Sequence, residues 1–475
     1  MFDVIVIGGG VIGGAVLREL TKYKCTACLV EKEHDVCMGQ SKANSGIVHA
    51  GFDAAEGTNK ARFNVLGNAM MSAYAEELGV AYKNIGSLVV AFSEGELGTL
   101  SALKERGERN GVGGLEIWNR ARLKGAEPHI SEGALGALYA PTAGIVCPYC
   151  LTIAAIGNAM DNGAALECDF DVVSVRKEGG GFIICAADGR EVRGRVAVNC
   201  AGLGAGKISA MFGDDTLRIG GRRGEYLLLD RADGDFVSHT LFFTPTRKGK
   251  GVLITPTADG NLLLGPTAEE VKGGSTETTA EGIMSVIAKA SEMCEGIPFR
   301  DVITSFAGVR AYSETHDFVL GESERAEGLF QCAGIESPGL TSAPAIAKYT
   351  AEKIAARLAL EKNPHFDGRR TPDHFFKGLS REEQNALVRA DPAYGKIVCR
   401  CEEVTEGEIV RAIRRNPPAR DIDGVKRRTR AGMGRCQSGF CQPHVAELLA
   451  RELGLPLDGV TKCGAGSEIL KGVSK

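Results

Sequence analysis

Four cysteines near the carboxyl end have the spacing of a metal or cluster site. Cys399 and Cys401 form a C-x-C pair, and Cys436 and Cys441 form a C-x4-C pair after 34 intervening residues. Four thiolates can hold either an iron–sulfur cluster or a structural zinc ion. The spacing alone leaves both ligands open.

Helix signals stand beside each cysteine pair. Thr405 and Glu408 form a capping box, which predicts a helix that runs to about Arg415. Pro443 suits the first turn of a last helix, which Gly454 would end. Both pairs would then flank helix N-termini, where the partial positive charge favours thiolates.

A second chemical signal lies at the amino end. Residues 2–7 read as a buried strand and are followed by Gly8, Gly10 and Gly13, a helical stretch, and a second strand that ends at Glu31. The glycines permit a tight turn, close approach of a pyrophosphate, and close packing of helix on strand. Glu31 occupies the position at which an acidic side chain of a dinucleotide-binding fold accepts a hydrogen bond from a ribose hydroxyl. The unit predicts a dinucleotide site, but it does not separate FAD from NAD.

Glycine-rich loops further along favour a flavin. Residues 39–51 offer many backbone N–H groups that could wrap a flavin ring or its phosphates. Residues 195–206 read as a strand that enters a glycine turn, and residues 328–359 read as strand, loop and helix. Thr341 or Ser342 is expected to cap that last helix, whose N-terminus would suit the electron-rich end of a reduced flavin.

These segments resemble a known family. DVIVIGGGVIG, NSGIVHAG, VNCAGLGA, SFAGVRA and GIESPGLT stand in the order seen in FAD-dependent oxidoreductases of the D-amino-acid oxidase/glycerol-3-phosphate dehydrogenase superfamily. The resemblance covers about residues 1–360 and implies an α/β, Rossmann-like FAD domain with an inserted α+β substrate domain built on an antiparallel sheet. We expect the FAD domain at about 1–80, 145–215 and 305–360, and the substrate domain at about 81–144 and 216–304. The strand-like runs GSLVVAF, EYLLLD, GVLITPT and NLLLGPT fit the insertion.

The glycine motif and the resemblance together predict the residues that hold FAD. They are Gly8, Gly10, Val11, Ile12, Gly13, Glu31, Lys32, Ser41, Asn44, Ser45, Gly46, Val173, Ala201, Gly202, Gly334, Pro338, Gly339, Leu340 and Thr341.

The cysteine module also resembles a family. VCRCEEVTEGEI and RRTRAGMGRCQSGFC are similar to the bacterioferritin-associated-ferredoxin-like [2Fe-2S] domain, in the version fused to large subunits of anaerobic glycerol-3-phosphate dehydrogenases. A redox relay belongs beside a flavin, whereas zinc does no redox chemistry. We therefore favour a [2Fe-2S] cluster, held by Cys399, Cys401, Cys436 and Cys441. The remaining eleven cysteines, including the CPYC pair Cys147 and Cys150, are interpreted as ordinary thiols.

Three residues are candidates for the reaction itself. By resemblance, Arg310 in SFAGVRA binds an anionic substrate, because arginine grips carboxylate or phosphate bidentately. His49 is the best candidate for the base, since a glycine-flanked loop leaves its imidazole room to meet substrate. Tyr226 could hydrogen-bond the substrate or belong to the core.

The resemblance implies a dehydrogenase that oxidises glycerol 3-phosphate to dihydroxyacetone phosphate. Electrons would pass from FAD to the [2Fe-2S] cluster and on to a protein partner or a quinone. Two alternatives stay open, namely a dehydrogenase of L-2-hydroxyglutarate, another 2-hydroxy acid or an amino acid, and an electron-transfer subunit without a substrate of its own.

Composition limits the number of domains and the classes of function that the protein can have. The 475 residues suffice for two or three domains, and the net charge of −4 argues against a nucleic-acid binder. Residues 397–475 carry 14 Lys and Arg against 10 Asp and Glu, so a basic [2Fe-2S] domain follows an acidic body across a linker at 361–396 that holds one short helix. With no apolar run of about 20 residues and no signal peptide, we expect a cytoplasmic protein, with peripheral attachment to the inner face of the membrane as an option.

Overall fold

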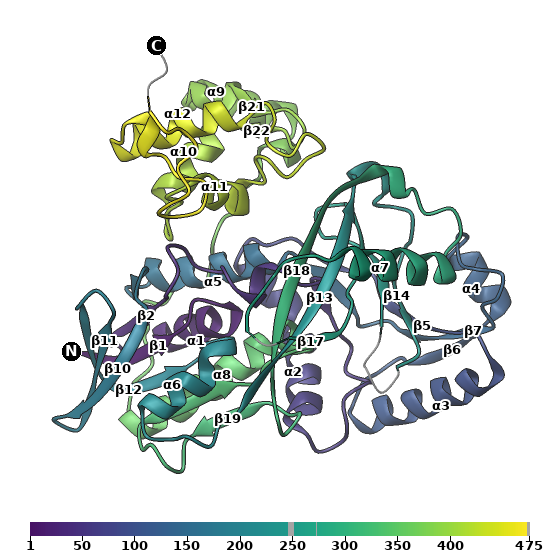
Figure 1. Cartoon of the computed structure of the whole chain (residues 1–475), viewed down its shortest axis with the longest axis horizontal. Helices are drawn as coiled ribbons and strands as arrows, with labels where there is room; N and C mark the ends of the chain where they lie inside the picture. The colour runs from purple at the N-terminus through teal and green to yellow at the C-terminus, as the bar shows by residue number, and fades with distance from the viewer. Residues whose placement is uncertain (246–250, 272, 473–475) are drawn as a thin grey trace.

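The computed structural model describes residues 1–245, 251–271 and 273–472, and they form three units. A nucleotide domain and a sheet domain lie side by side, and a C-terminal module sits on the nucleotide domain above helix α5 (Pro148–Asp161), as Figure 1 shows. No described helix combines the length and the apolar character needed to cross a bilayer.

The amino-terminal strand–helix–strand prediction is confirmed. Strand β1 (Phe2–Ile7) runs parallel to β2 (Ala27–Val30), and α1 (Val11–Thr21) connects them. Gly8 has a φ of +112°, and a Cβ on Gly13 would collide with the carbonyl oxygen of Gly8. Both positions therefore require glycine, one for its dihedral angle and the other for the close approach of helix and turn.

Segments far apart in the sequence complete the sheet of the nucleotide domain. Five parallel strands stand in the order β9, β2, β1, β12 and β20, with β19 antiparallel at one edge and the β10–β11 hairpin paired to β12. Their bounds are β9 Ala165–Glu167, β12 Glu191–Asn199, β20 Leu329–Ala333, β19 Val319–Glu322, β10 Val172–Glu178 and β11 Gly181–Ala186. The predicted discontinuous Rossmann-like domain is present.

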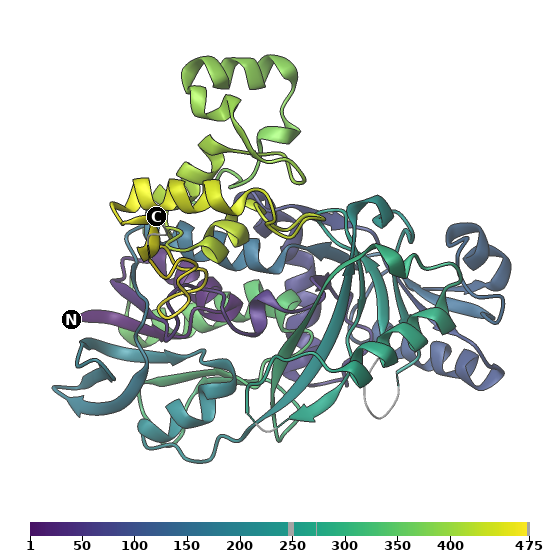
Figure 2. The same ribbon diagram turned by 45° about the horizontal axis from the view of Figure 1, so that its top comes forward.

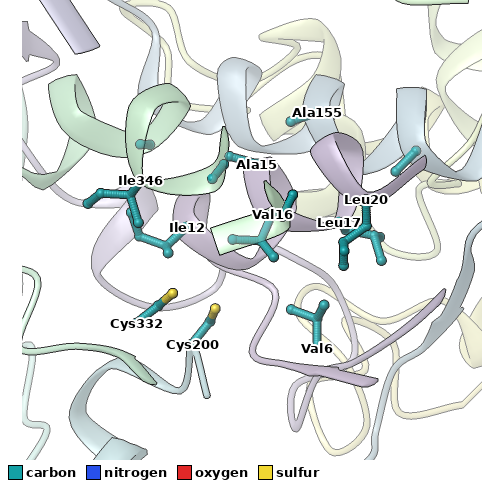
Figure 3. Packing of buried hydrophobic residues seen from close by; sticks show 14 of the residues in the cluster. Val6, Ile12, Ala15, Val16, Leu17, Leu20, Ala155, Cys200, Cys332 and Ile346 are labelled. Atoms are coloured by element: carbon teal, nitrogen blue, oxygen red, sulfur yellow. The ribbon is translucent and has the colours of Figure 1, made fainter. Parts of the chain in front are cut away.

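Helices α1, α5 and α8 (Gly339–Leu358) cover one face of this sheet, together with α2 (Asn59–Glu77). Figure 3 shows Ile12 and Val16 of α1 among Ala155 of α5, Ile346 of α8 and Val6 of β1, all of which are buried. Helix α6 (Ala205–Met211) packs near β12. The apolar contacts of α1 with α5, α8 and β1 fix the N-terminus of α1 against the strand ends.

The N-terminus of α8 corrects one expectation. Neither Thr341 nor Ser342 caps the helix, because Pro338 is the N-cap residue and no side chain bonds there. The Thr341 hydroxyl instead accepts a hydrogen bond from the His49 N–H at 2.9 Å. Thr341 therefore ties α8 to the loop that carries His49.

The sheet domain holds a larger and mostly antiparallel sheet. Its described strands follow the order β17, β13, β16, β15, β14, β5, β7 and β6, with β18 also paired to β13, and β14 runs parallel to β5. The bounds are β5 Ser87–Ala91, β6 Glu116–Asn119, β7 Gly136–Ala140, β13 Ile219–Leu229, β14 Thr240–Phe243, β15 Leu253–Pro256, β16 Leu262–Gly265, β17 Glu269–Val271 and β18 Val302–Ser313. All four predicted strand runs are strands of this sheet. Strand β18 belongs to it along its whole length, whereas our division of the chain placed residues from 305 onward in the FAD domain.

Three helices and a small sheet surround this layer. The helices are α3 (Glu94–Arg109), α4 (Arg120–Ala126) and α7 (Ala280–Met293). Strands β3 (Ile47–Val48), β8 (Gly144–Val146) and β4 (Tyr82–Asn84) form a short sheet at the junction of the two domains. This sheet places residue 49 at the domain boundary.

The C-terminal module has its own apolar core around Ile409, Val425 and Leu449. It contains a hairpin of β21 (Ile397–Cys399) and β22 (Val404–Thr405) and the helices α10 (Glu406–Arg414), α11 (Ile422–Thr429) and α12 (Gln442–Leu453). The predicted capping box of Thr405 and Glu408 is present, and Gly454 ends α12 in the left-handed conformation.

The segment before this module is only partly a linker. Its predicted short helix is α9 (Arg381–Ala390), which stands away from the body in Figure 2. Upstream of it, Arg370 is buried, pairs with Asp161 at 3.0 Å and bonds the Asn416 carbonyl. Residues 361–370 therefore lie along the nucleotide domain, whereas His374, Phe375 and Phe376 bond Glu408 of the module.

Candidate functional site

A cavity of about 1030 Å³ lies between the nucleotide and sheet domains. The glycine turn after β1 and the loop of residues 38–54 line it from one side, and strands β13 and β18 line it from the other. A dinucleotide at one end would therefore reach a pocket walled by the sheet domain. Such a boundary between domains is a common place for a cofactor site.

The end of the cavity at α1 has the features of a phosphate and ribose site. Gly10 is the N-cap of α1 and lacks a side-chain cap, and the Ser41 hydroxyl accepts a hydrogen bond from the Val11 N–H at 2.9 Å. The Glu31 carboxylate lines the cavity and accepts a hydrogen bond from the Gly9 N–H at 2.6 Å. Burial raises the pKa of the Glu31 carboxyl. The donors of a helix N-terminus and a carboxylate beyond them fit a pyrophosphate and its ribose.

Most of the predicted FAD residues line this cavity. They are Gly8, Gly10, Val11, Ile12, Glu31, Lys32, Ser41, Asn44, Ser45, Ala201, Gly202, Gly334, Pro338, Gly339 and Leu340. The other four do not: Gly13 packs on the turn, Thr341 is buried, Gly46 lines a second cavity, and Val173 is 44% exposed. At the last position the neighbouring Val172 lines the cavity instead.

Gln40 holds two walls of the cavity together. Its amide donates a hydrogen bond to the Ile335 carbonyl at 3.0 Å, and its Oε1 accepts one from the Ala311 N–H at 2.8 Å. One side chain thus joins the loop of residues 38–54 to β18 and to the turn before α8. Nothing in the glycine motif signals this residue.

His49 and Tyr226 both line the deeper part of the cavity. His49 Nε2 lies 3.2 Å from the Ser337 hydroxyl, and the ring lies 5.8 Å from that of Phe242. Tyr226 stacks on Phe306 at 4.8 Å, and burial raises the pKa of its phenol. Tyr226 is therefore both a core residue and a wall of the site, with a neutral hydroxyl.

Arg310 lies in β18 opposite Arg222 of β13, and both line the cavity. Its Nη2 donates to the Thr267 carbonyl at 2.8 Å. Its Nε is buried, and within the described ranges no atom accepts a hydrogen bond from it. Together, Arg310 and Arg222 give this wall of the cavity a positive charge that suits an anion.

Two further charged residues of the site were missed from the sequence. Lys60 of α2 and Glu336 of the turn before α8 line the cavity and form an ion pair at 2.8 Å. Arg222 lies 3.6 Å from the same Glu336 carboxylate. Glu336 stands within the GIESPG motif, which was the available signal, whereas Lys60 carries none.

The structure brings the four predicted ligand cysteines together as two pairs. The Sγ atoms of Cys401 and Cys436 are 3.6 Å apart, and Cys399 and Cys441 form a thiol hydrogen bond. No group of three or more His, Cys, Asp or Glu side chains within the described ranges suits a single metal ion. Two neighbouring pairs of thiols fit the two irons of a [2Fe-2S] cluster, each iron taking one pair.

None of the fifteen cysteines forms a disulfide, and the interpretation of the other eleven as ordinary thiols stays a prediction. Cys147 and Cys150 lie at the start of α5, and a hydrogen bond that the Cys150 thiol donates to Cys147, together with burial, raises the pKa of Cys150. A thiol of this kind is a poor nucleophile.

Comparison with known proteins agrees with this geometry. Residues 3–353 match the model of the FAD dependent oxidoreductase family, and residues 397–451 match the BFD-like [2Fe-2S] binding domain. These matches confirm the two cofactors expected from the sequence.

The similar proteins include enzymes of glycerol 3-phosphate and of L-2-hydroxyglutarate. A glycerol 3-phosphate dehydrogenase of Caloramator mitchellensis is 46% identical over 479 residues, which cover 100% of this chain and 99% of the relative. An L-2-hydroxyglutarate dehydrogenase of Mus musculus is 30% identical over 412 residues, which cover 74% of this chain and 88% of the relative. Among solved structures, dithionite-reduced L-α-glycerophosphate oxidase of Mycoplasma pneumoniae with FAD bound has a TM-score of 0.73 at 28% identity and covers 78% of this chain and 98% of its own.

The match to residues 3–353 spans more than half of the chain, and the cavity and the paired thiols carry the corresponding chemistry. The chain therefore belongs to the FAD dependent oxidoreductase family and carries a BFD-like [2Fe-2S] binding domain as its C-terminal module.

Proposed function

We propose that this protein oxidises glycerol 3-phosphate to dihydroxyacetone phosphate and passes the electrons through its [2Fe-2S] domain to a protein partner. The observation that carries the proposal is the Arg310 guanidinium, which lines the cavity beside that of Arg222. The full-length similarity to a glycerol 3-phosphate dehydrogenase supports the choice of substrate.

The residues of the cavity have separate roles in this reaction. Arg310 binds the phosphate through the two N–H groups of Nη1, since Nη2 is held by the Thr267 carbonyl and Nε is buried. Lys60 and Arg222 add positive charge on the same wall, moderated by Glu336. The substrate is thereby oriented with its secondary alcohol toward the loop that carries His49.

His49 accepts the hydroxyl proton of the alcohol as the C–O bond becomes a carbonyl. Bound FAD supplies the acceptor of the hydride that leaves carbon 2. The backbone of His49 is fixed by Thr341 and by Asn64, whose amide donates to the His49 carbonyl at 2.8 Å. The imidazole is therefore held by α8 and α2 while its Nε2 faces the cavity.

An L-2-hydroxyglutarate dehydrogenase is the second candidate. Arg310 suits a carboxylate as well as a phosphate, and the Mus musculus relative favours this reading. A subunit without its own substrate is the third, and the intact set of His49, Tyr226 and Arg310 around one cavity argues against it.

One experiment separates the three. The purified enzyme, loaded with FAD and cluster, is mixed anaerobically with glycerol 3-phosphate, L-2-hydroxyglutarate or an amino acid, and flavin absorbance is followed. We expect rapid bleaching by glycerol 3-phosphate alone. Bleaching by L-2-hydroxyglutarate would transfer the proposal to that acid, and no bleaching by any of them would favour the electron-transfer subunit.

A further inference from the structure

The C-terminal module contacts the nucleotide domain through the very loop that lines the FAD cavity. Asp35 lies in this loop, four residues after Glu31, and is buried. Arg428 of α11 donates to both Asp35 oxygens at 2.8 Å, and Arg427 donates to Oδ2 at 2.5 Å. A carboxylate held by two buried arginines is a firm tie, because removing one partner leaves a buried charge uncompensated.

A third arginine of the same segment joins all three units. Arg430 donates from Nε to Glu402 of the module at 2.7 Å and from Nη1 to the Tyr149 hydroxyl of α5 at 3.1 Å. The same Nη1 pairs with Asp259 of the sheet domain at 2.7 Å, and Nη2 donates to Asn261 at 3.1 Å. Arg430 is also the C-cap of α11, which it ends in the left-handed conformation with a φ of +68°.

A short segment of the flavin loop, residues 42–45, lies between the FAD cavity and a second cavity beside the module. Residues 42–45 line the FAD cavity on one side and a second cavity of about 640 Å³ on the other. The far wall of the second cavity includes Arg427, Arg430 and Met433, and Met433 precedes Cys436 by three residues. The wall of the flavin site thus also faces the cluster module across the second cavity.

We propose that Asp35 and Arg430 are positioning residues of an interdomain clamp that holds the [2Fe-2S] module in one fixed pose and orders the flavin loop of residues 31–46. The module is then a structural part of the FAD site and not a carrier that swings between a donor and an acceptor. FAD binding and module docking are coupled, because Glu31 and Asp35 belong to the same loop. The clamp joins the flavin loop to the [2Fe-2S] module and includes no residue that binds substrate. A failure of this proposal can therefore be distinguished from a failure of the proposed reaction.

The test compares Asp35→Asn and Arg430→Lys with the wild type and with Arg451→Gln. Asp35→Asn keeps the volume of the side chain but removes its charge, and Arg430→Lys keeps the charge but cannot reach four partners. Arg451 is an exposed arginine of the same module that pairs with Glu406 within it, so its replacement is the matched control. Hydrogen exchange is measured in peptides covering residues 31–46 and 422–434, and FAD affinity is measured by titrating the flavin-free protein.

We expect Asp35→Asn to exchange at least about 100-fold faster in both peptides and to bind FAD about tenfold more weakly, with wild-type iron content. Arg430→Lys is expected to give the same pattern at smaller size, and Arg451→Gln none of it. Wild-type exchange and FAD affinity in both clamp variants would overturn the proposal. Faster exchange at 422–434 with unchanged exchange at 31–46 would also overturn it, since docking would then not order the flavin loop. If Asp35→Asn does not fold, Arg430→Lys alone decides between these outcomes.

Discussion

Replacing Arg310 by glutamine gives the sharpest test of how this enzyme selects its substrate. One terminal nitrogen of Arg310, Nη2, is held by the Thr267 carbonyl and Nε is buried, so the two N–H groups of Nη1 remain for the anion. Each charge-assisted hydrogen bond contributes about 1.5–3 kcal/mol. Two of them amount to roughly 3–6 kcal/mol, which corresponds to a loss of about 10²–10⁴-fold in kcat/KM for glycerol 3-phosphate.

The assay compares two alcohols that differ in the anion alone. Steady-state rates with an artificial electron acceptor are measured for glycerol 3-phosphate and for glycerol, in the wild type and in Arg310→Gln. Because glycerol carries no phosphate, its low kcat/KM should change less than threefold. Arg195→Gln, which removes an exposed arginine paired with Asp3, serves as the control for charge and should leave both rates unchanged.

Two results would refute this reasoning. If kcat/KM for glycerol 3-phosphate falls less than tenfold, Arg310 does not hold the phosphate, and Lys60 or Arg222 becomes the leading anion-binding residue. If the rates with both alcohols fall equally, Arg310 acts by supporting the strand β18 and not by recognising the anion. A selective loss for the phosphate ester is the outcome that agrees with recognition of the anion by Arg310.

Three further predictions address the base, the cluster and the module. His49→Gln should lower kcat about 100-fold with little change in FAD affinity, because a general base is lost. The rate of flavin bleaching by substrate is measured by stopped flow, and an unchanged rate would exclude His49 as the base. Cys401→Ser should remove the visible and electron paramagnetic resonance signals of the cluster and lower bound iron while flavin bleaching by substrate persists, and zinc in the wild-type protein would contradict the assignment. Despite its burial, the hydrogen bond and charge of His374 lower the pKa of Glu408 to about 2, so this carboxylate stabilises the module above pH ~4.5 and loses that contribution as the pH falls toward 2. Glu408→Gln should therefore reduce the free energy of unfolding at pH 7 by about 2–3 kcal/mol, measured by urea denaturation with circular dichroism, and the difference from wild type should shrink below pH 4.

Local patterns predicted the parts of this protein whose geometry is local. The turn at Gly8, the packing of Gly13 and the capping box at Thr405 each depend on residues a few positions apart, and all are present. The strands of the sheet domain were found because their apolar runs are short and bounded by turns. Their antiparallel pairing and the FAD domain came from the family resemblance.

What the sequence missed depends on contacts between distant segments or on a single step of register. Side chains of a strand alternate between its two faces, so Val172 lines the cavity while the side chain of Val173, the residue that we predicted at the FAD site, is exposed. Lys60 and Glu336 meet across 276 positions, and Asp35 meets Arg428 across 393. No periodicity or motif within either segment encodes such pairs, because tertiary packing brings them together.

The exposure of the cluster ligands gives the proposed electron transfer a direction. Cys399 and Cys441 are each 2% exposed, whereas Cys401 is exposed to solvent and Cys436 is half-buried. Glu402 and Met433, beside the ligand cysteines, face inward toward Arg430 and Tyr149. The surface beside the ligands carries Phe440, which is 81% exposed and precedes Cys441. One side of the module thus rests on the flavin loop while the thiols of Cys401 and Cys436 reach the solvent. A protein that accepts electrons can therefore approach the cluster without displacing the module from its docked position, as a fixed clamp requires.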